Sequence, residues 1–197
     1  MTFDPQPVLL AGRHVRLEPL EPRHESALLA AAKDPEVFRW FLTPPLGEPG
    51  EMRKWLEDAF RAQAARTEVA FATVRAADGR VVGSTRFLDI RRPHRALEIG
   101  NTWLAREAQR TAINTEAKLL MLTQAFEGWG AGRVQLKTDE RNDASRAAIA
   151  RLGCAFEGVL RKYQARYDGY IRNTAMFSLV ADEWPAAKAR LQARLQC

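Results

Sequence analysis

A strand-like run, a short polar turn and a long apolar helix pattern follow one another in the middle of the chain. The strand spans residues 96–104, the turn falls within residues 108–118, and the helix pattern covers about residues 115–126. The first N–H groups of a helix have no partner within the helix, and the helix dipole places partial positive charge there. Arg110 adds a full positive charge. This arrangement predicts an anion site in which the turn holds the pyrophosphate of a large cofactor.

Strands and amphipathic helices alternate on both sides of this unit. Apolar periodicity predicts strands near residues 14–20, 69–74, 81–90, 133–138, 154–164 and 170–180, and helices near 22–33, 51–66 and 142–152. A last helix begins near Asp182, and Asp78-Gly79 marks a hairpin turn. Hairpins that alternate with crossover helices imply an α/β (α+β) fold, in which helices cover a mixed sheet. We expect one domain over residues 1–197, because no repeat or linker interrupts the pattern.

The composition excludes several classes of protein. Hydrophobic residues make up 46% and charged residues 27% of the chain, and no apolar run is long enough to span a bilayer. The N-terminus lacks a signal sequence, so we expect a cytoplasmic protein. Cys154 lies in an apolar stretch and Cys197 is the last residue, which argues against a structural disulfide. The three histidines, His14, His24 and His94, have no metal-binding spacing.

The net charge of +6 and the isoelectric point near 9.7 raise the question of a nucleic-acid partner. The basic residues are spread along the chain, with pairs such as Arg91-Arg92 rather than runs, and no RNA-binding signature stands out. A solvated basic surface is therefore the favoured interpretation, and we do not expect direct nucleic-acid binding. The same charge suits a phosphate-rich cofactor.

Several short motifs, in this order and spacing, resemble the GNAT N-acetyltransferases, in the branch related to the ribosomal-protein N-acetyltransferases RimJ and RimL. The likeness covers nearly the whole chain. The motifs are Leu17-Glu18-Pro19-Leu20, Gly83-Ser84, Glu98-Ile99-Gly100, residues 109–117, residues 142–146, residues 152–158 and Tyr167-Asp168-Gly169-Tyr170.

The resemblance implies a mostly antiparallel sheet of about seven strands with helices on both faces, in which the fourth and fifth strands splay apart. It also implies acetyl-CoA as donor and an amine as acceptor. The pantetheine arm would pair with the backbone of the fourth strand near residues 101–104, as an added strand does. The pyrophosphate would lie on the N–H groups of residues 110–115. The implied cofactor-binding residues are Trp103, Leu104, Gln109, Arg110, Thr111, Ala112, Ile113, Asn114, Thr115 and Asn142.

The phosphate loop departs from the family pattern at two small positions. The family has Gln or Arg, two residues, Gly, one residue, and then Gly or Ala, whereas this chain has Gln109, Ala112 and Asn114 at those positions. Glycine allows close approach of the backbone and positive φ. Ala112 adds a methyl group, which is tolerated if the local φ is negative and otherwise weakens the site. Asn114 could instead cap the helix.

Amine acetylation needs a deprotonated amine and a proton for the leaving thiolate. Glu98 could accept the amine proton, since alternation places it on the same side of the strand as Gly100 and Thr102. The structural alternative is an ion pair of Glu98 with Arg86 or Arg95.

Asn142 and Ser145 share one face at the start of a helix. Asn142 is expected to cap that helix. By resemblance, Asn142 also holds the pantetheine, and Ser145 donates a proton to the thiolate.

Other positions leave alternatives open. Gln164 stands where RimL-like enzymes carry a base, and glutamine cannot take a proton at neutral pH. Glu98 or a water chain would then serve, or the amine arrives neutral, or activity has been lost. Tyr163 and Tyr167 are acids by type but are more often packing residues. Trp40, Phe41 and Trp55 line either an acceptor cleft or the core, and Arg86 and Asp89 could face the acceptor. Cys154 is interpreted as a buried apolar residue.

The leading hypothesis is an acetyl-CoA-dependent N-acyltransferase that acts on a protein N-terminus or a small-molecule amine by direct attack on the thioester. A non-catalytic acyl-CoA-binding or sensing protein of the same fold is the alternative, motivated by Ala112 and Gln164. We expect no metal and no membrane association. Dimers are common in the family, so a homodimer is compatible with the resemblance.

Overall fold

A single eight-stranded sheet organises the protein. The computed structural model describes residues 3–196. The strands are β1 (Leu10–Ala11), β2 (Val15–Pro19), β3 (Val69–Arg75), β4 (Val81–Arg91), β5 (Ala96–Leu104), β6 (Arg133–Asp139), β7 (Ala155–Ala165) and β8 (Ile171–Val180). Their order across the sheet is β1-β2-β3-β4-β5-β6-β8-β7, and only the β5–β6 pair is parallel. The mixed, mostly antiparallel sheet is thus confirmed. The strand beyond the expected seven is β1, which at two residues is too short to show alternation.

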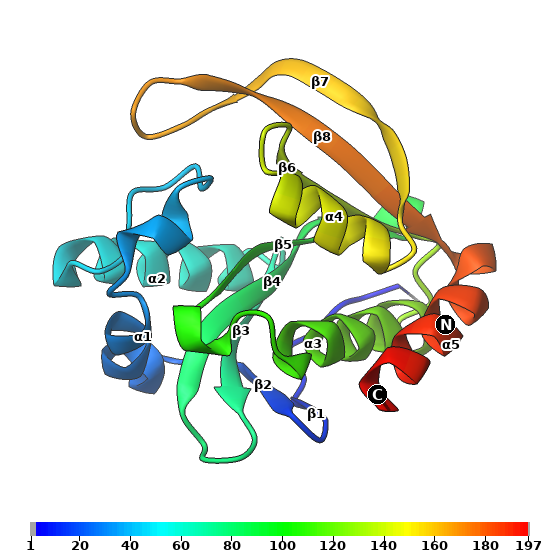
Figure 1. The fold of residues 1–197 in the computed structure, drawn as a ribbon, viewed down its shortest axis with the longest axis horizontal. Helices are drawn as coiled ribbons and strands as arrows, with labels where there is room; N and C mark the ends of the chain where they lie inside the picture. The colour runs from blue at the N-terminus through cyan, green and yellow to red at the C-terminus, as the bar shows by residue number, and fades with distance from the viewer. Residues whose placement is uncertain (1–2, 197) are drawn as a thin grey trace.

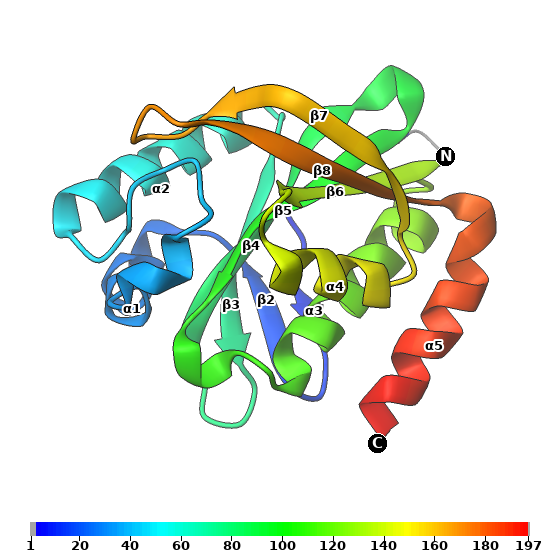
Figure 2. The same cartoon turned by 45° about the horizontal axis from the view of Figure 1, so that its top comes forward.

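Helices cover both faces of the sheet, as predicted (Figures 1 and 2). They are α1 (Glu25–Ala31), α2 (Pro49–Ala64), α3 (Ala112–Thr123), α4 (Asp143–Arg151) and α5 (Trp184–Gln196). Two apolar cores result. Helices α1 and α2 bury one core against Ala70, Ala72 and Trp103 of the sheet. Helices α3, α4 and α5 bury the other against the opposite face, where Leu97 and Ile99 point.

Local signals set most element ends. Gly79 and Gly169 adopt φ values of +70° and +82° in the β3–β4 and β7–β8 turns, a conformation that glycine adopts without steric cost. Asn142 caps α4, and its Oδ1 accepts a hydrogen bond from the Ser145 N–H at 3.1 Å. Gly153, just past the end of α4, has a φ of +95°. The predicted Asp78-Gly79 turn and the predicted Asn142 cap are confirmed.

The start of α3 differs from the prediction. The helix begins at Ala112, about three residues earlier than its apolar pattern, and Thr111 rather than Asn114 is the capping residue. The Thr111 hydroxyl accepts from the Ile113 N–H at 3.3 Å and donates to the Ala108 carbonyl at 2.8 Å. The first turn is polar, so hydrophobic periodicity could not reveal it, whereas the threonine cap could.

A buried carboxylate anchors α3 to the edge of the sheet. Glu116 accepts hydrogen bonds from the backbone N–H groups of Arg13, His14 and Val15, at 2.9, 2.6 and 2.9 Å. A Cβ atom on Gly12 would overlap this carboxylate, which explains the glycine there. The contact joins α3 to the β1–β2 turn and so fixes the helix whose N-terminus is the predicted anion site.

Strands β5 and β6 pair over only three residues each. Residues 96–98 of β5 pair with residues 133–135 of β6, and beyond Glu98 the two strands diverge. The splay implied for the fourth and fifth predicted strands is therefore present between β5 and β6. On its other edge, β5 carries a bulge: Asn101, with φ +50°, and Thr102 together face Thr85 of β4.

Candidate active site

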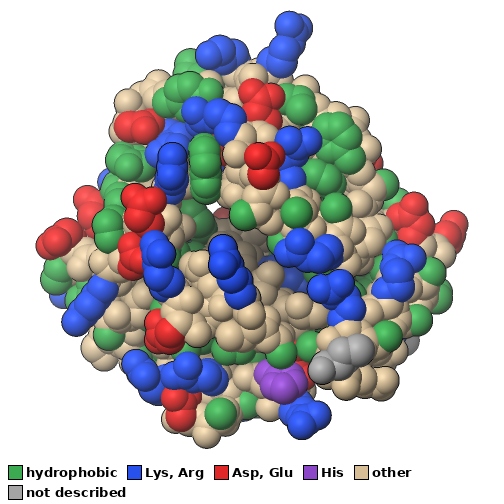
Figure 3. Space-filling model, viewed as in Figure 1, with side chains coloured by type: hydrophobic (Ala, Val, Ile, Leu, Met, Phe, Trp, Pro, Cys, Tyr) green, Lys and Arg blue, Asp and Glu red, His purple; other side chains and the backbone are tan. Residues whose placement is uncertain are grey.

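The site lies where β5 and β6 separate. Because these strands are parallel, their carboxyl ends lie at the same edge of the sheet, and the helices that follow them, α3 and α4, both begin there. Figure 3, viewed as in Figure 1, shows a hollow near the centre of the molecular surface. Lys and Arg side chains lie around this hollow. Two helix N-termini and a gap between strands thus share one region.

The loop from β5 to α3 is the predicted anion cradle. Arg110 adopts a φ of +59°, and Ala112 is the first residue of α3. The positive φ that a glycine would favour therefore falls on Arg110, not on Ala112. The Gln109 side chain donates from Nε2 to the Leu104 carbonyl at 2.9 Å, which closes the loop against the end of β5. Ala112 therefore meets the condition under which its methyl group is expected to be tolerated, which is a negative φ.

A basic cavity of about 220 Å³ adjoins this cradle. It is lined by Arg13, His14 and Arg75 from the two neighbouring hairpins, together with Glu107 and the first residues of α3. Arg75 is paired with Asp78 at 2.7 Å. Arg13 is thus the cation of this lining that has no carboxylate partner among the described residues, and it adds to the positive end of α3.

Glu98 is buried and ion-paired. Its side chain is 3% exposed, and its Oε2 atom accepts from Lys137 Nζ at 2.9 Å and from Gln135 Nε2 at 2.9 Å, both on β6. The alternative prediction, that Glu98 forms an ion pair, is confirmed, but both predicted partners were wrong. Arg86 pairs with Glu68, and Arg95 donates to the Gly130 carbonyl.

The other carboxylate oxygen of Glu98 is open to the site. None of the described residues donates a hydrogen bond to Oε1 of Glu98. The absent side chain of Gly100 leaves space beside that atom, since a Cβ there would come within 3.0 Å of it. Leu97 and Ile99 point into the α3 core, so Glu98 and Gly100 point to the opposite face, toward α2.

Thr102 does not share that face, contrary to the simple alternation. The bulge at Asn101 inserts one residue, and Thr102 instead contacts Lys118 of α3. A bulge has no reliable signature in a single sequence, and a one-residue insertion reverses every side chain beyond it.

Asn142 and Ser145 lie at the start of α4, after the diverging end of β6. Both are half-buried. Among the described residues, none accepts a hydrogen bond from the Ser145 hydroxyl, so this group is available to a ligand. The residues predicted at the thiol end are thus placed at the edge where β5, α3 and α4 meet.

Comparison with known proteins decides the family. The Acetyltransferase (GNAT) domain model matches residues 14–155. The chain belongs to the GNAT acetyltransferase family. A curated GNAT relative is YdaF from Bacillus subtilis, provisionally named a ribosomal N-acetyltransferase, which is 31% identical over 111 residues. That match covers 56% of this chain and 60% of YdaF, less than two thirds of the relative. It supports the predicted RimJ/RimL-like branch.

Solved GNAT structures have the same fold. A GCN5-related N-acetyltransferase from Brucella melitensis superposes with a TM-score of 0.90 at 32% identity, covering 98% of this chain and 87% of that one. Mycobacterium smegmatis RimJ, solved in complex with CoA-disulfide, has a TM-score of 0.82 at 21% identity, covering 95% of each chain. The latter likeness is one of fold alone.

Some aromatic residues predicted near the GNAT cofactor or acceptor belong to the core. The Trp103 side chain is 2% exposed and packs against Phe38 and Trp55, with ring centroids 5.3 and 6.3 Å away. Leu104 lies in the α3 core. The side chains of these two β5 residues are therefore enclosed in the core, which leaves only their backbone for the predicted cofactor contact. Trp40 remains beside the site, as its carbonyl accepts from Arg172 at 3.2 Å.

Two buried cations near this site were missed in the sequence analysis, Lys118 and Arg172. Lys118, on α3, donates from Nζ to the hydroxyls of Thr85 and Thr102 at 3.0 and 2.7 Å. Burial lowers the pKa of Lys118 to about 7. Lys118 falls on the apolar face of a helix, and that position was the available signal for its burial.

Other reactive groups and ligands find little support. Burial raises the pKa of the Cys154 thiol to about 12, so this cysteine is not a nucleophile, and Cys197 lies outside the described residues. Within residues 3–196, no group of three or more His, Cys, Asp or Glu side chains could hold a metal ion, and no helix could cross a membrane.

The cradle geometry predicts a small effect for Ala112→Gly. Since Ala112 already has a helical φ, removing its methyl group should change the affinity for CoA by less than about threefold and cost less than about 1 kcal/mol of stability. Isothermal calorimetry with CoA and urea unfolding measure both quantities, and Ala147→Gly on the exposed face of α4 is the matched control. A tenfold tighter complex would show instead that the methyl group obstructs the phosphates.

Proposed function

We propose that residues 1–197 form one catalytic domain that transfers an acetyl group from acetyl-CoA to a primary amine. The observation that carries this proposal is the divergence of β5 and β6 beyond Glu98, next to the N-terminus of α3. A gap between strands suits an extended arm with amide groups, and a helix N-terminus suits its pyrophosphate. The complex of RimJ with CoA-disulfide supports a CoA ligand for this fold.

The backbone of β5 after Glu98 would pair with pantetheine, and the N–H groups at the start of α3 would hold the phosphates. Arg110 and the basic cavity around Arg13 and Arg75 supply positive charge for them. Asn142 would hold the arm on the α4 side. The donor, when bound, supplies an activated acetyl thioester.

Glu98 and Ser145 carry the proton transfers in this proposal. Oε1 of Glu98 accepts a proton from the amine, directly or through a water molecule, while Lys137 and Gln135 hold Oε2 in place. The amine nitrogen bonds to the acetyl carbon, the carbon–sulfur bond breaks, and the Ser145 hydroxyl gives its proton to the sulfur. The proton taken up by Glu98 then passes through water to Ser145, which restores both groups. Much of the rate acceleration comes from holding the amine, the thioester and these two side chains close together and correctly oriented.

Gln164 is not part of this proton path. Its Oε1 accepts from Arg172 Nη2 at 3.1 Å, so the residue at the position of the RimL-like base has a structural contact. The loss of a base there does not require a loss of activity if Glu98 serves.

A thiol-release assay with acetyl-CoA tests the function. We expect turnover with at least one class among peptides, amino acids and polyamines. Tight CoA binding without turnover of any of these amines would contradict the proposal, and would favour the acyl-CoA-binding alternative.

A further inference from the structure

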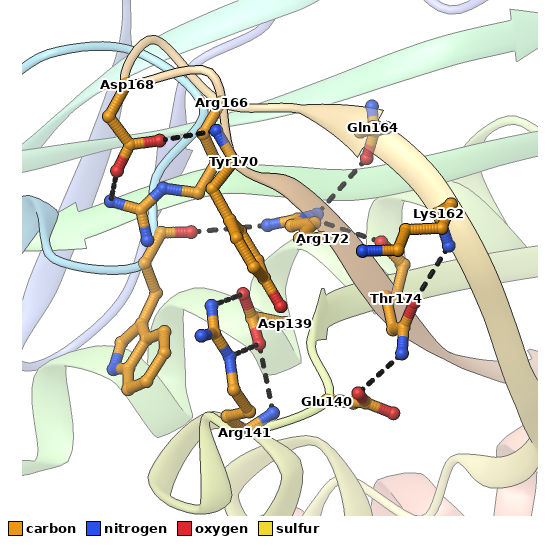
Figure 4. A network of polar contacts seen from close by, with 12 residues as sticks. Asp139, Glu140, Arg141, Lys162, Gln164, Arg166, Asp168, Tyr170, Arg172 and Thr174 are labelled. Carbon is orange, nitrogen blue, oxygen red and sulfur yellow. Dashed lines mark hydrogen bonds and ion pairs between the residues drawn. The ribbon is translucent and has the colours of Figure 1, made fainter.

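Arg172 of β8 is a buried cation without a carboxylate of its own. The residue is 6% exposed. Its Nε donates to the Thr174 hydroxyl at 3.2 Å, Nη1 to the Trp40 carbonyl at 3.2 Å, and Nη2 to Gln164 Oε1 at 3.1 Å. All three acceptors are neutral (Figure 4). Arginine has five N–H donors, so one N–H on each Nη atom has no acceptor among the described residues.

Other buried cations on this face are matched. Arg86 pairs with Glu68 at 2.8 Å, and Lys137 pairs with Glu98 at 2.9 Å. Lys118, on the other face, can lose its charge, but a guanidinium cannot. Arg172 therefore carries a full charge that is mostly removed from water.

The network around Arg172 has a surplus positive charge. Asp139 forms a two-point ion pair with Arg141, at 2.9 and 2.8 Å, and Asp168 pairs with Arg166 at 3.3 Å. Figure 4 also draws Lys162 and Glu140, whose carboxylate accepts from Asn173 at 2.7 Å, so four cations face three carboxylates in this network. In Figure 4 these groups line one side of the β7–β8 hairpin. Burial lowers the pKa of Arg172, and the fields of Asp139 and Glu98 only partly oppose this effect. A further anion would stabilise this arrangement.

Arg172 faces the same space as Glu98. Thr174 pairs with Asp139, and Met176 pairs with Lys137, whose ammonium group contacts Glu98. Residues that pair across strands share a face, so Arg172, two residues before Thr174, lies on the Glu98 side. The contribution of Glu98 to the pKa of Arg172 also shows that the two charges lie within each other's field.

The position of Arg172 is held from outside the hairpin. Besides the Arg172–Trp40 bond, the Tyr167 N–H donates to the Leu42 carbonyl at 2.8 Å. In Figures 1 and 2 the β7–β8 hairpin reaches over to the segment between α1 and α2. These bonds preorganise the guanidinium, which reduces the entropy lost when a ligand binds.

We propose that Arg172 binds a carboxylate of the acceptor, so that the enzyme acetylates amines that carry a carboxylate near the amine. This inference rests on the proposed acetyl transfer. The amine would lie toward Glu98 and the carboxylate toward Arg172. Two sources have this chemistry: free amino acids, and peptides with Asp or Glu at the N-terminus. The positive charge of Arg172 also disfavours the protonated amine, which cannot attack.

The test compares carboxylates with matched amides in the thiol-release assay. We expect kcat/KM for the carboxylate to exceed that for the amide by roughly ten- to hundredfold, as for hydrogen bonds to charged groups. One arm uses amino acids and their amides, and the other uses peptides that begin with Asp or Glu against Asn or Gln. An amino-acid amide is the weaker base and holds more free amine, so amine protonation cannot produce the expected preference.

Arg172→Gln should remove the preference, mainly through KM, and leave CoA affinity unchanged. Arg172→Lys keeps the charge and should retain part of the preference, which guards against a folding defect in the first variant. Arg151→Gln, on the exposed face of α4, controls for net charge. Equal rates for carboxylates and amides in the wild type, or a preference that survives in Arg172→Gln, would overturn the proposal.

A binding measurement separates this inference from the proposed function. If no amine is acetylated, acetyl transfer fails, and calorimetry in the presence of CoA still tests the site with N-acetyl amino acids and their amides. Carboxylate binding that Arg172→Gln abolishes would support the site. No difference between carboxylate and amide would refute it.

Discussion

Replacing Glu98 by Gln should lower kcat by roughly a hundred- to ten-thousandfold, the usual contribution of a general base. The amide keeps the size of the side chain and can still contact Gln135, but it cannot take a proton from the amine. CoA affinity should not change, because Glu98 contacts β6 rather than the phosphate cradle. Steady-state kinetics with the best acceptor, together with calorimetry for CoA, measure both effects.

Lys137→Met is the matched control for this experiment. It removes the ion-pair partner on β6 but leaves the carboxylate of Glu98 and its open Oε1 atom. We expect a smaller loss of kcat than in Glu98→Gln. If Glu98→Gln keeps more than about a tenth of the wild-type rate, far above the expected loss of a general base, then Glu98 is an ion-pair residue and the amine is deprotonated otherwise. An equal loss in both variants would show that the pair acts as a unit.

Replacing Lys118 by Met should remove a strong pH dependence of stability. Burial lowers the pKa of Lys118 from 10.5 to about 7. Between these values the unfolded chain binds a proton at Lys118 that the folded protein does not, so raising the pH favours the folded state. The wild type should gain up to about 1.4 kcal/mol of stability for each pH unit in this window, relative to Lys118→Met. Below pH 7 both states are protonated, and the difference becomes constant.

Urea unfolding at several pH values between 7 and 10 measures this effect. Subtracting the Lys118→Met curve cancels the groups that titrate in both proteins, and Lys54→Met, on the exposed surface of α2, controls for the loss of a surface charge. Parallel stability curves for the wild type and Lys118→Met would mean that Lys118 stays charged when folded, and would contradict the prediction.

Structural features that depend on residues adjacent in sequence could be predicted. The Asn142 cap, the turns at Gly79 and Gly169 and the order of strands and helices follow from capping, backbone freedom and periodicity. Where local signals were weak, the prediction was less accurate. The two-residue β1 shows no alternation, so it was not predicted. The first turn of α3 is polar, so the predicted start of this helix was about three residues later than the observed start at Ala112.

The sequence by itself determined the family and the order strand, turn and helix at the candidate anion site, because motif order and short-range geometry depend on consecutive residues. Only the tertiary structure decided which side chains contact one another at the candidate site. Lys137 pairs with Glu98 from another strand, the bulge at Asn101 turns Thr102 to the α3 face, and Arg172 is enclosed by segments from across the chain. Such contacts join residues far apart in sequence, and burial and charge at these positions depend on what the folded chain places beside them.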